Sequence, residues 1–447
     1  MAAPSHRRAL RKRRTLVVSA AVVAAGAGAG VFVMNANATG ADLYHQTLAA
    51  EDGWAASGTG TTGGAKADSA HTFTVSTRAQ LVKALGSASD STPRIIKVKG
   101  TVDANTDDSG RKLTCADYAK GTGYSLPAYL KAYDPATYGR SELPSGAQEK
   151  ARAAAQGRQA ENIVFKVPAN TTIVGVPGTN AGILGGSLQV KNVDNVIIRN
   201  LLFSATEDCF PQWDPTDGDK GNWNSQYDAV TLRGATHVWV DHNSFTDAPH
   251  YDSATPDYYG RQYQVHDGDL DITNGSDLVT VERNQFTDHD KTMLIGSSDK
   301  DSTGKLRVSI HHNVWKGIVQ RAPLARIGRI HVYNNLYDTT TVDGYAPLYS
   351  INSRAGAQVV AQANYWKVPS GGKVAALLSG DGTGSVAGSG NLVNGTVTDL
   401  VAVYNAASSK KIKTTVNWKP ALTAGLESSA AGLPTELAAT TGAGVLN

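Results

Sequence analysis

The chain has 447 residues, of which 41% are hydrophobic and 18% charged, so it is long enough to bury a large core. Its 46 glycines against 16 prolines indicate many turns without the composition of a disordered chain. The formal net charge is +3, and the first 14 positions hold six basic residues, which leaves the rest of the chain at about −3. This balance argues against nucleic acid as a partner.

The N-terminus has the layout of a secretory signal: a basic segment, then the apolar stretch 16–34, then small residues at Ala36 and Ala38. We therefore predict a signal peptide over residues 1–38 and one secreted, extracellular domain with a C-terminal extension over residues 39–447. The alternative is a membrane anchor, because about nineteen apolar residues can just span a bilayer. Its richness in glycine and alanine disfavours the anchor, so we expect no membrane partner after cleavage, and a monomer.

The chain has two cysteines, Cys115 and Cys209. In an oxidising compartment we expect one disulfide between them, which would close a long loop. Two buried free thiols are the alternative that the spacing leaves open.

Few regular elements are predicted before residue 163. The glycine-rich stretch 53–64 lacks the lysine of a phosphate-binding loop, which argues against a nucleotide site. Ser76 is predicted to cap a short helix, and residues 95–98 are predicted as the first strand. Residues 106–159 are polar and predict a long excursion with one or two helices.

From residue 163 onward one pattern recurs: aliphatic residues, an asparagine near the fifth or sixth place, and an aromatic at the end. The six strings begin at Val196, Val238, Val279, Val308, Ile330 and Val359. Their starts are 42, 41, 29, 22 and 29 residues apart. A strand, a bend that asparagine tolerates and an aromatic that stacks on the next turn describe one rung of a solenoid.

This repeat predicts an all-β fold, a parallel β-helix with inserted loops and a few short peripheral helices. A spacing near 22 residues corresponds to a bare coil, and the longer spacings to a coil with an insertion. The competing architecture is an antiparallel β-sandwich, whose hairpins would not repeat one string six times. Insertions on one face of a solenoid are where a binding cleft is normally built.

Two arginines, Arg321 and Arg326, lie on a short connection between two strand-like strings. Pro323 between them suits a bend rather than the interior of a sheet. Arginines at such a place invite carboxylate partners, and Lys291 lies upstream in the same region. Solvated surface charge or a structural salt bridge is the alternative explanation.

A second candidate group is acidic. Asp267 and Asp271 are four residues apart, which in an extended chain places both carboxylates on one face, with Asp269 between them. Oxygen-only, acidic donors suit calcium, and Asp228 can join them if its coil stacks directly below. The alternative is turn capping. The positions of glycine and glutamate exclude an EF-hand, and Asp217 is a further, weaker candidate.

Several motifs together resemble the secreted pectate lyase family, particularly its bacterial branch. They are V-W-V-D-H (238–242), Y-Y-G-R-Q-Y-Q-V-H-D-G-D-L-D (258–271) and I-V-Q-R-A-P-L-A-R (318–326). The resemblance extends in order from about Gly53 to Trp366 and then thins.

The resemblance implies a right-handed parallel β-helix that cleaves homogalacturonan (polygalacturonate) by calcium-dependent β-elimination, giving unsaturated oligogalacturonides. It implies the calcium ligands Asp228, Asp267 and Asp271, the catalytic base Arg321, and the cations Lys291 and Arg326 that bind substrate carboxylates. His242 would then be structural rather than catalytic. Where many relatives carry a further acidic residue, this chain has Gln226, which suggests weak calcium binding until substrate adds its own carboxylates.

The implied chemistry is consistent with these residues. Elimination needs removal of the proton beside a uronate carboxylate, which cations around that carboxylate favour. Arginine is an unusual base because guanidinium normally stays protonated, so we expect activity to be best at alkaline pH. The rival functions are a glycoside hydrolase, a calcium-free pectin lyase on methyl-esterified polymer, and a β-helix that only binds acidic polysaccharide.

Overall fold

The computed structural model describes residues 42–302 and 304–446. The predicted signal peptide, residues 1–38, lies outside the described residues. In the part of the chain that is described, no helix combines the length and the apolar character needed to cross a bilayer.

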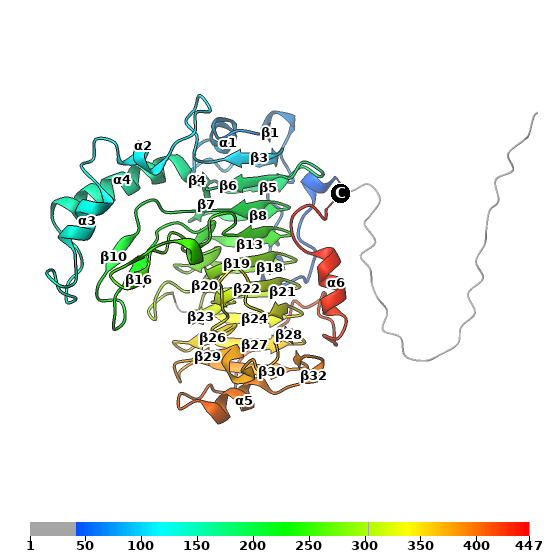
Figure 1. Ribbon diagram of the computed structural model, residues 1–447. Helices are drawn as coiled ribbons and strands as arrows, with labels where there is room; N and C mark the ends of the chain where they lie inside the picture. The colour runs from blue at the N-terminus through cyan, green and yellow to red at the C-terminus, as the bar shows by residue number, and fades with distance from the viewer. Residues whose placement is uncertain (1–41, 303, 447) are drawn as a thin grey trace, which may run out of the picture. The chain divides into compact units, whose positions relative to one another are not determined.

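Three parallel sheets run along a solenoid, and each regular turn adds one strand to each sheet (Figure 1). Sheet A contains β1 (Thr72–Val75), β2 (Arg94–Val98), β5 (Thr171–Gly175), β8 (Asp194–Arg199), β13 (Thr236–Asp241), β18 (Asp277–Glu282), β21 (Arg307–His311), β24 (Arg329–Tyr333), β27 (Gln358–Gln362) and β30 (Ser385–Ser389). Sheet B contains β4 (Val164–Val167), β7 (Ser187–Lys191), β12 (Val230–Arg233), β17 (Leu270–Thr273), β20 (Leu294–Ile295), β23 (Leu324–Arg326), β26 (Ile351–Arg354) and β29 (Leu378–Gly380). Sheet C contains β3 (Thr101–Asp103), β6 (Gly182–Leu184), β9 (Leu202–Ser204), β14 (Ser244–Thr246), β19 (Gln285–Lys291), β22 (Val314–Gln320), β25 (Leu336–Asp338), β28 (Tyr365–Lys367), β31 (Leu392–Val393) and β32 (Thr396–Val397).

Within each turn the chain passes from sheet A to sheet C and then to sheet B. Neighbouring strands are parallel and in register except β31 and β32, which pair antiparallel at the end of sheet C. The fold is the predicted right-handed parallel β-helix, and the antiparallel sandwich is excluded. Aliphatic side chains of the three sheets fill its interior, which forms one continuous core.

The six repeated strings each span the end of a sheet A strand, a bend and the start of a sheet C strand. A buried asparagine ladder follows this bend through successive turns, formed by Asn243, Asn284, Asn313, Asn335, Asn364 and Asn391. The side-chain oxygen of Asn313, for example, accepts from the backbone N–H of Asn284 at 2.9 Å. This oxygen satisfies a buried donor that the bend removes from the sheet.

The bend itself is made one residue earlier than the sequence predicts. The left-handed conformation belongs to the residue before the ladder asparagine, with φ of 51° at His242, 49° at Arg283 and 54° at His312. The asparagine is therefore selected for its hydrogen bonds to the next turn rather than for its tolerance of a bend. An asparagine takes the bend position itself in two strings, at Asn200 with φ of 57° and at Asn334 with φ of 50°.

The predicted aromatic stack is confirmed. The aromatics that end the strings lie on one another inside the solenoid, in the order Phe203, Phe245, Phe286, Trp315, Tyr337 and Trp366. Their ring centroids are 4.3 to 5.9 Å apart and their planes lie within 12° of one another. Stacked aromatics add to the apolar area that the turns bury against each other.

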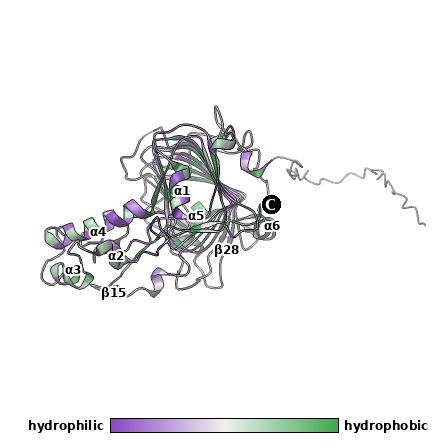
Figure 2. Cartoon of the chain, turned by 90° about the horizontal axis from the view of Figure 1, so that it is seen from above, coloured by the Kyte–Doolittle hydropathy of each residue, from purple (hydrophilic) through white to green (hydrophobic). Residues whose placement is uncertain are grey.

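The N-terminal elements differ from the prediction in detail. Helix α1 (Arg78–Leu85) is capped by Thr77, whose side chain accepts from the N–H of Gln80, and not by Ser76. The first strand is β1, which precedes the predicted one. The excursion forms three helices, α2 (Cys115–Ala119), α3 (Leu126–Ala132) and α4 (Ala147–Ile163), which make a lobe at the side of the solenoid (Figure 2).

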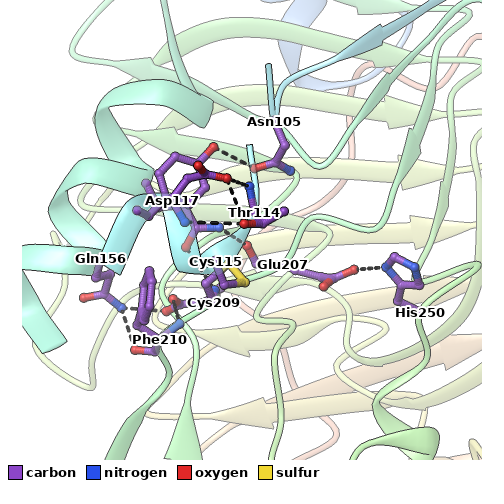
Figure 3. The surroundings of a disulfide bond; sticks show 12 residues. Asn105, Thr114, Cys115, Asp117, Gln156, Glu207, Cys209, Phe210 and His250 are labelled. Atoms are coloured by element: carbon purple, nitrogen blue, oxygen red, sulfur yellow. Dashed lines mark hydrogen bonds and ion pairs between the residues drawn. A yellow bond between two sulfur atoms is a disulfide. The ribbon is translucent and has the colours of Figure 1, made fainter. Parts of the chain in front are cut away.

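The predicted disulfide between Cys115 and Cys209 is present, with the two Cα atoms 5.4 Å apart (Figure 3). Cys115 begins α2, and Cys209 belongs to the insertion that follows β9. The bond therefore ties the helical lobe to the solenoid across 94 residues of sequence.

The C-terminal segment does more than close the solenoid. After α5 (Leu400–Ala407) at its end, the chain turns back, and α6 (Leu433–Thr440) lies along the earlier turns (Figure 1). Leu433 and Leu437 are fully buried there. The N–H of Gly444 donates to the side chain of Asn200 at 2.7 Å, so the chain end reaches the turn of β8.

We expect Asn313→Ala to lower the free energy of unfolding by about 2–4 kcal/mol, because it leaves the buried N–H of Asn284 without an acceptor. Denaturant-induced unfolding measures this loss. Asn417→Ala, at an exposed position, should leave the unfolding midpoint unchanged. Equal effects of the two changes would contradict the role of the ladder.

Candidate active site

The predicted site residues lie on four consecutive turns, at the connections from sheet C to sheet B. Their positions are Asp228 before β12, Asp267 before β17, Asp271 in β17, Lys291 at the end of β19, Arg321 between β22 and β23, and Arg326 at the end of β23. The strands β12, β17, β20 and β23 are neighbours in sheet B, so the stacking of turns brings all six residues to one face of the solenoid.

Two carboxylates are held by hydrogen bonds from the backbone and from a neighbouring hydroxyl. Asp228 accepts from the N–H of Gly268 at 3.0 Å and from the hydroxyl of Thr231 at 2.8 Å. Asp271 accepts from the N–H of Leu294 at 3.0 Å. Both side chains are buried, and these bonds orient both oxygens of Asp228 and one oxygen of Asp271 without neutralising their charge.

The electrostatics of these carboxylates are unfavourable in the absence of a cation. Burial raises the pKa of Asp228 well above its usual range, and the charges of Asp271 and Asp267 raise it further. Burial, together with the charge of Asp267, raises the pKa of Asp271 to about 7. The raised pKa values of Asp228 and Asp271 show that a positive ion between these two carboxylates would be favourable.

Gly268 keeps the space between two of these groups open. A Cβ atom at this position would lie 2.6 Å from an oxygen of Asp271 and 2.9 Å from an oxygen of Asp228. Glycine is therefore the one residue that fits between the carboxylates without displacing them.

The donor set fits calcium better than zinc. In the described residues, two groups elsewhere place three ligating atoms within 4.8 Å of one another, and the three aspartates are not gathered as tightly. Calcium takes six to eight oxygen ligands at about 2.3–2.6 Å and completes its shell with carbonyls, water or ligand oxygens. The oxygen-only carboxylates around Gly268 suit such an ion.

The cations lie on the next turns. The ammonium of Lys291 is 3.9 Å from Asp267, and its side chain is buried. Arg326 donates to Asp299 at 3.1 Å and to the carbonyl of Gly296 at 3.0 Å. Burial lowers the pKa of the Arg326 guanidinium, and the neighbouring positive charges of Arg354 and Arg321 add to this effect. The arrangement favours anions bound between these side chains.

Arg321 differs from Arg326 in its contacts. In the described part of the chain it forms no ion pair within 4 Å, and its Nε atom is buried without a hydrogen-bond partner. Its backbone is left-handed, with φ of 61°, a conformation that costs a non-glycine residue about 1 kcal/mol or more. The expected carboxylate partner is thus absent at Arg321 and present at Arg326.

The other sequence candidates lie apart from this group. Asp269 is buried beside His289, with 3.8 Å between the carboxylate and the ring Nδ1, and burial raises its pKa to about 7. Asp217 is exposed in the loop of the β10 (Gln212–Asp214) and β11 (Asn222–Asn224) hairpin. His242 is paired with Asp241 at the bend between sheets A and C, which is a different connection from that of the six site residues.

The structure adds residues that the sequence analysis missed. Arg354 stands opposite Arg326 in the next turn and lies 3.8 Å from Asp299. Both arginines end a sheet B strand and are followed two residues later by glycine, so comparing 324–328 with 352–356 could have revealed the pair. His289 donates from Nε2 to the carbonyl of Asp267 at 2.8 Å, which supports the backbone of that residue.

Comparisons with known proteins agree with this geometry. The pectate lyase family model matches residues 142–424. A pectate lyase of Bacillus subtilis (strain 168) is 48% identical over 417 residues, which cover 92% of this chain and 96% of that protein. Pectate lyase D of Dickeya chrysanthemi is 36% identical over 71% of this chain and 70% of its own. A solved pectate lyase bound to hexasaccharide has a TM-score of 0.86 at 46% identity and covers 91% of this chain and all (100%) of that one.

We expect Gly268→Ala to weaken calcium binding at least tenfold, because the added methyl group displaces the oxygens of Asp228 and Asp271. Isothermal titration with calcium measures the change. Gly157→Ala is the matched control, since a Cβ atom there meets no atom within 4 Å. Unchanged affinity in Gly268→Ala would show that calcium does not bind between these carboxylates.

Proposed function

The chain belongs to the pectate lyase family of polysaccharide lyases, and we propose that it cleaves polygalacturonate by calcium-dependent β-elimination. One observation carries the proposal. The buried carboxylates of Asp228 and Asp271 lie around Gly268, and consecutive turns of the same face carry Lys291, 3.9 Å from Asp267, and the arginines Arg321 and Arg326. An anionic polymer bound along sheet B would meet both groups at once.

Asp228, Asp267 and Asp271 would hold the calcium ion. Bound there, the ion supplies positive charge that neutralises a uronate carboxylate and makes the adjacent proton more acidic. With Gln226 in place of a further acidic residue, substrate carboxylates are expected to complete the shell.

The protein's own side chains perform the remaining steps. Lys291 and Arg326 bind and orient uronate carboxylates by charge-assisted hydrogen bonds. Arg321 removes the proton on the carbon beside the carboxylate, through a guanidine group that makes no ion pair of its own. The electron pair forms a carbon–carbon double bond as the bond to the glycosidic oxygen breaks, and that oxygen leaves with a proton from solvent.

The rival functions fit the site less well. A glycoside hydrolase needs an acid and a base carboxylate set apart for attack by water, whereas Asp228 and Asp271 face each other across Gly268. A pectin lyase acting on neutral methyl esters has no use for buried carboxylates that await a cation. A protein that only binds polysaccharide does not need the strained backbone at Arg321.

The location of the protein is also a proposal. We infer that it is secreted as a monomer after cleavage of residues 1–38. The disulfide between Cys115 and Cys209 supports an oxidising compartment.

Arg321→Ala is expected to reduce the growth of ultraviolet absorbance on polygalacturonate by about 10²–10⁴-fold, because the base is removed while the carboxylates stay in place. Arg233→Ala, an exposed arginine of sheet B, is the matched control and should retain activity. Excess chelator should abolish the signal of the unchanged enzyme.

Three outcomes would overturn the assignment. New reducing ends without ultraviolet absorbance would identify a hydrolase. Activity that survives chelation and prefers methyl-esterified polymer would identify a pectin lyase. If neither reducing ends nor ultraviolet absorbance appeared, the protein would be one that only binds polysaccharide.

Calcium affinity is expected to rise with pH between about pH 6 and pH 8. The raised pKa values of Asp228 and Asp271 mean that both carboxyls hold protons below that range, and calcium must displace them. Titration calorimetry in two buffers of different ionisation enthalpy measures the released protons. Proton-independent binding across this range would be inconsistent with the buried carboxylates as ligands.

A further inference from the structure

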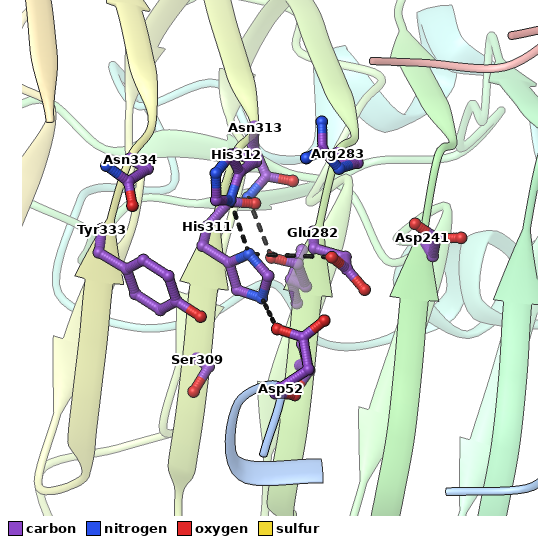
Figure 4. A network of polar contacts seen from close by, with 12 residues as sticks. Asp52, Asp241, Glu282, Arg283, Ser309, His311, His312, Asn313, Tyr333 and Asn334 are labelled. Carbon is purple, nitrogen blue, oxygen red and sulfur yellow. Dashed lines mark hydrogen bonds and ion pairs between the residues drawn. The ribbon is translucent and has the colours of Figure 1, made fainter. Parts of the chain in front are cut away.

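A second group of titratable side chains lies on sheet A, where the N-terminal and C-terminal segments cover it (Figure 4). His311 ends β21, and His312 forms the bend that follows. Asp52 approaches from the N-terminal segment and Glu427 from the C-terminal segment. None of these side chains takes part in the proposed lyase chemistry, which occurs on sheet B.

These four residues form a linear chain of contacts. Nε2 of His311 is 3.4 Å from Oδ1 of Asp52, and Nδ1 of His311 is 2.9 Å from Nδ1 of His312. Nε2 of His312 is 3.4 Å from an oxygen of Glu427. The four side chains therefore make three contacts, and in each contact both atoms can accept a hydrogen bond.

Counting hydrogens shows that, with both carboxylates ionised, these four residues lack one donor for their three contacts. Each neutral imidazole carries a single N–H, so two histidines can satisfy only two of the three contacts. With the carboxylates ionised, the third contact brings two lone pairs together in a buried place, which is costly. His311 is 1% exposed, so water has no access to its ring as an alternative partner.

The contacts of His311 with Asp52 and of His312 with Glu427 are both 3.4 Å long, and the first of them leaves both of its atoms buried. Nε2 of His311 and Oδ1 of Asp52 are both buried without a partner. Their separation of 3.4 Å exceeds that of a good N–H···O bond. The same separation matches the distance between two ligand atoms of a tetrahedral zinc site, because ligands about 2.0–2.1 Å from the ion lie roughly 3.3–3.4 Å apart.

A third ligand is in place. Glu282 ends β18 beside His311, and its oxygen, one nitrogen of His311 and one oxygen of Asp52 lie within 4.8 Å of one another. One oxygen of Glu282 accepts from the indole N–H of Trp239 at 2.6 Å, which leaves the other free and orients the carboxylate. Glu282 is buried and forms no ion pair with an arginine or lysine in the described residues.

We propose that Asp52, Glu282 and His311 form a binding site for a zinc ion. A site of one imidazole and two carboxylates suits zinc, whereas calcium prefers oxygen ligands alone. Zinc on Nε2 of His311 leaves the hydrogen on Nδ1, which then donates to His312, and His312 donates from Nε2 to Glu427. Each of the three contacts then has a partner. The hydrogen bonds from His311 to His312 and from His312 to Glu427 fix the tautomer of His311.

The site would tie the start of the chain to the solenoid. Around Asp52 the N-terminal segment already makes backbone contacts, including the N–H of Gly53 to the carbonyl of Leu422 at 3.0 Å. It also bonds to sheet A, where the N–H of Ala55 donates to the hydroxyl of Thr280 at 3.1 Å. An ion shared by Asp52 and the strand ends β18 and β21 would join three segments that are distant in sequence.

The second three-ligand group, His312, Glu427 and Glu436, is a weaker candidate. Glu427 and Glu436 are only partly buried, and Arg283 lies 3.3 Å from Glu436 and supplies positive charge. In addition, the proposed zinc site needs His312 as the acceptor of the hydrogen bond from Nδ1 of His311.

Zinc content tests the proposal directly. The protein is stripped with chelator, returned to millimolar calcium to saturate the oxygen sites, dialysed with zinc and analysed for bound metal. We expect about one zinc ion per chain and a higher melting temperature than in the stripped protein. Asp52→Asn and Glu282→Gln should each weaken zinc binding at least tenfold and remove the increase in melting temperature.

Asp194→Asn is the matched control, because Asp194 forms an Asp–His pair with His237 on the same sheet but at an exposed position. It should retain zinc. If Glu282→Gln fails to fold, Asp52→Asn decides alone, since its side chain lies on the covering segment. Protein that retains no zinc, or variants that retain as much as the parent, would overturn the proposal.

Discussion

The in-register stacking of parallel turns is the constraint on which the rest of the structure depends. The asparagine ladder and the aromatic stack both lie where sheet A passes into sheet C, and they hold each turn directly above the last. Parallel strands are spaced about 4.8 Å apart, so residues at equivalent places of neighbouring turns become neighbours. Asp228 and Arg326 are far apart in sequence, and they come to lie on the same face of the solenoid because their turns are stacked.

The candidate active site collects charges that folding would not gather for stability. Asp228 and Asp271 are buried near each other, and Arg321 has a strained backbone and an unpaired nitrogen. Such features persist where the surrounding structure determines them, and here the surrounding sheet B strands do so. The same rigidity keeps Gly268 between the carboxylates, so the proposed cation site would be formed before any ligand arrives.

Two cation sites of different chemistry would then share one solenoid. On sheet B the donors are carboxylates open to a polymeric ligand, which suits a large, oxygen-seeking ion that exchanges. On sheet A the donors of Asp52, Glu282 and His311 are covered by both ends of the chain, which suits a retained ion. The first site would serve catalysis and the second would hold the covering segments in place.

The sequence by itself determined the architecture and supplied the candidate site residues, because a repeated string and family motifs are written in the order of residues. Arg321, Lys291 and the three aspartates were therefore within reach of prediction, although their roles remain proposals. Only the tertiary structure decided which residues face each other: Asp269 turns to His289, Arg354 joins Arg326, and Asp52 reaches His311. Such contacts depend on the register between turns and on the path of the covering segments, and neither has a local signature in the chain.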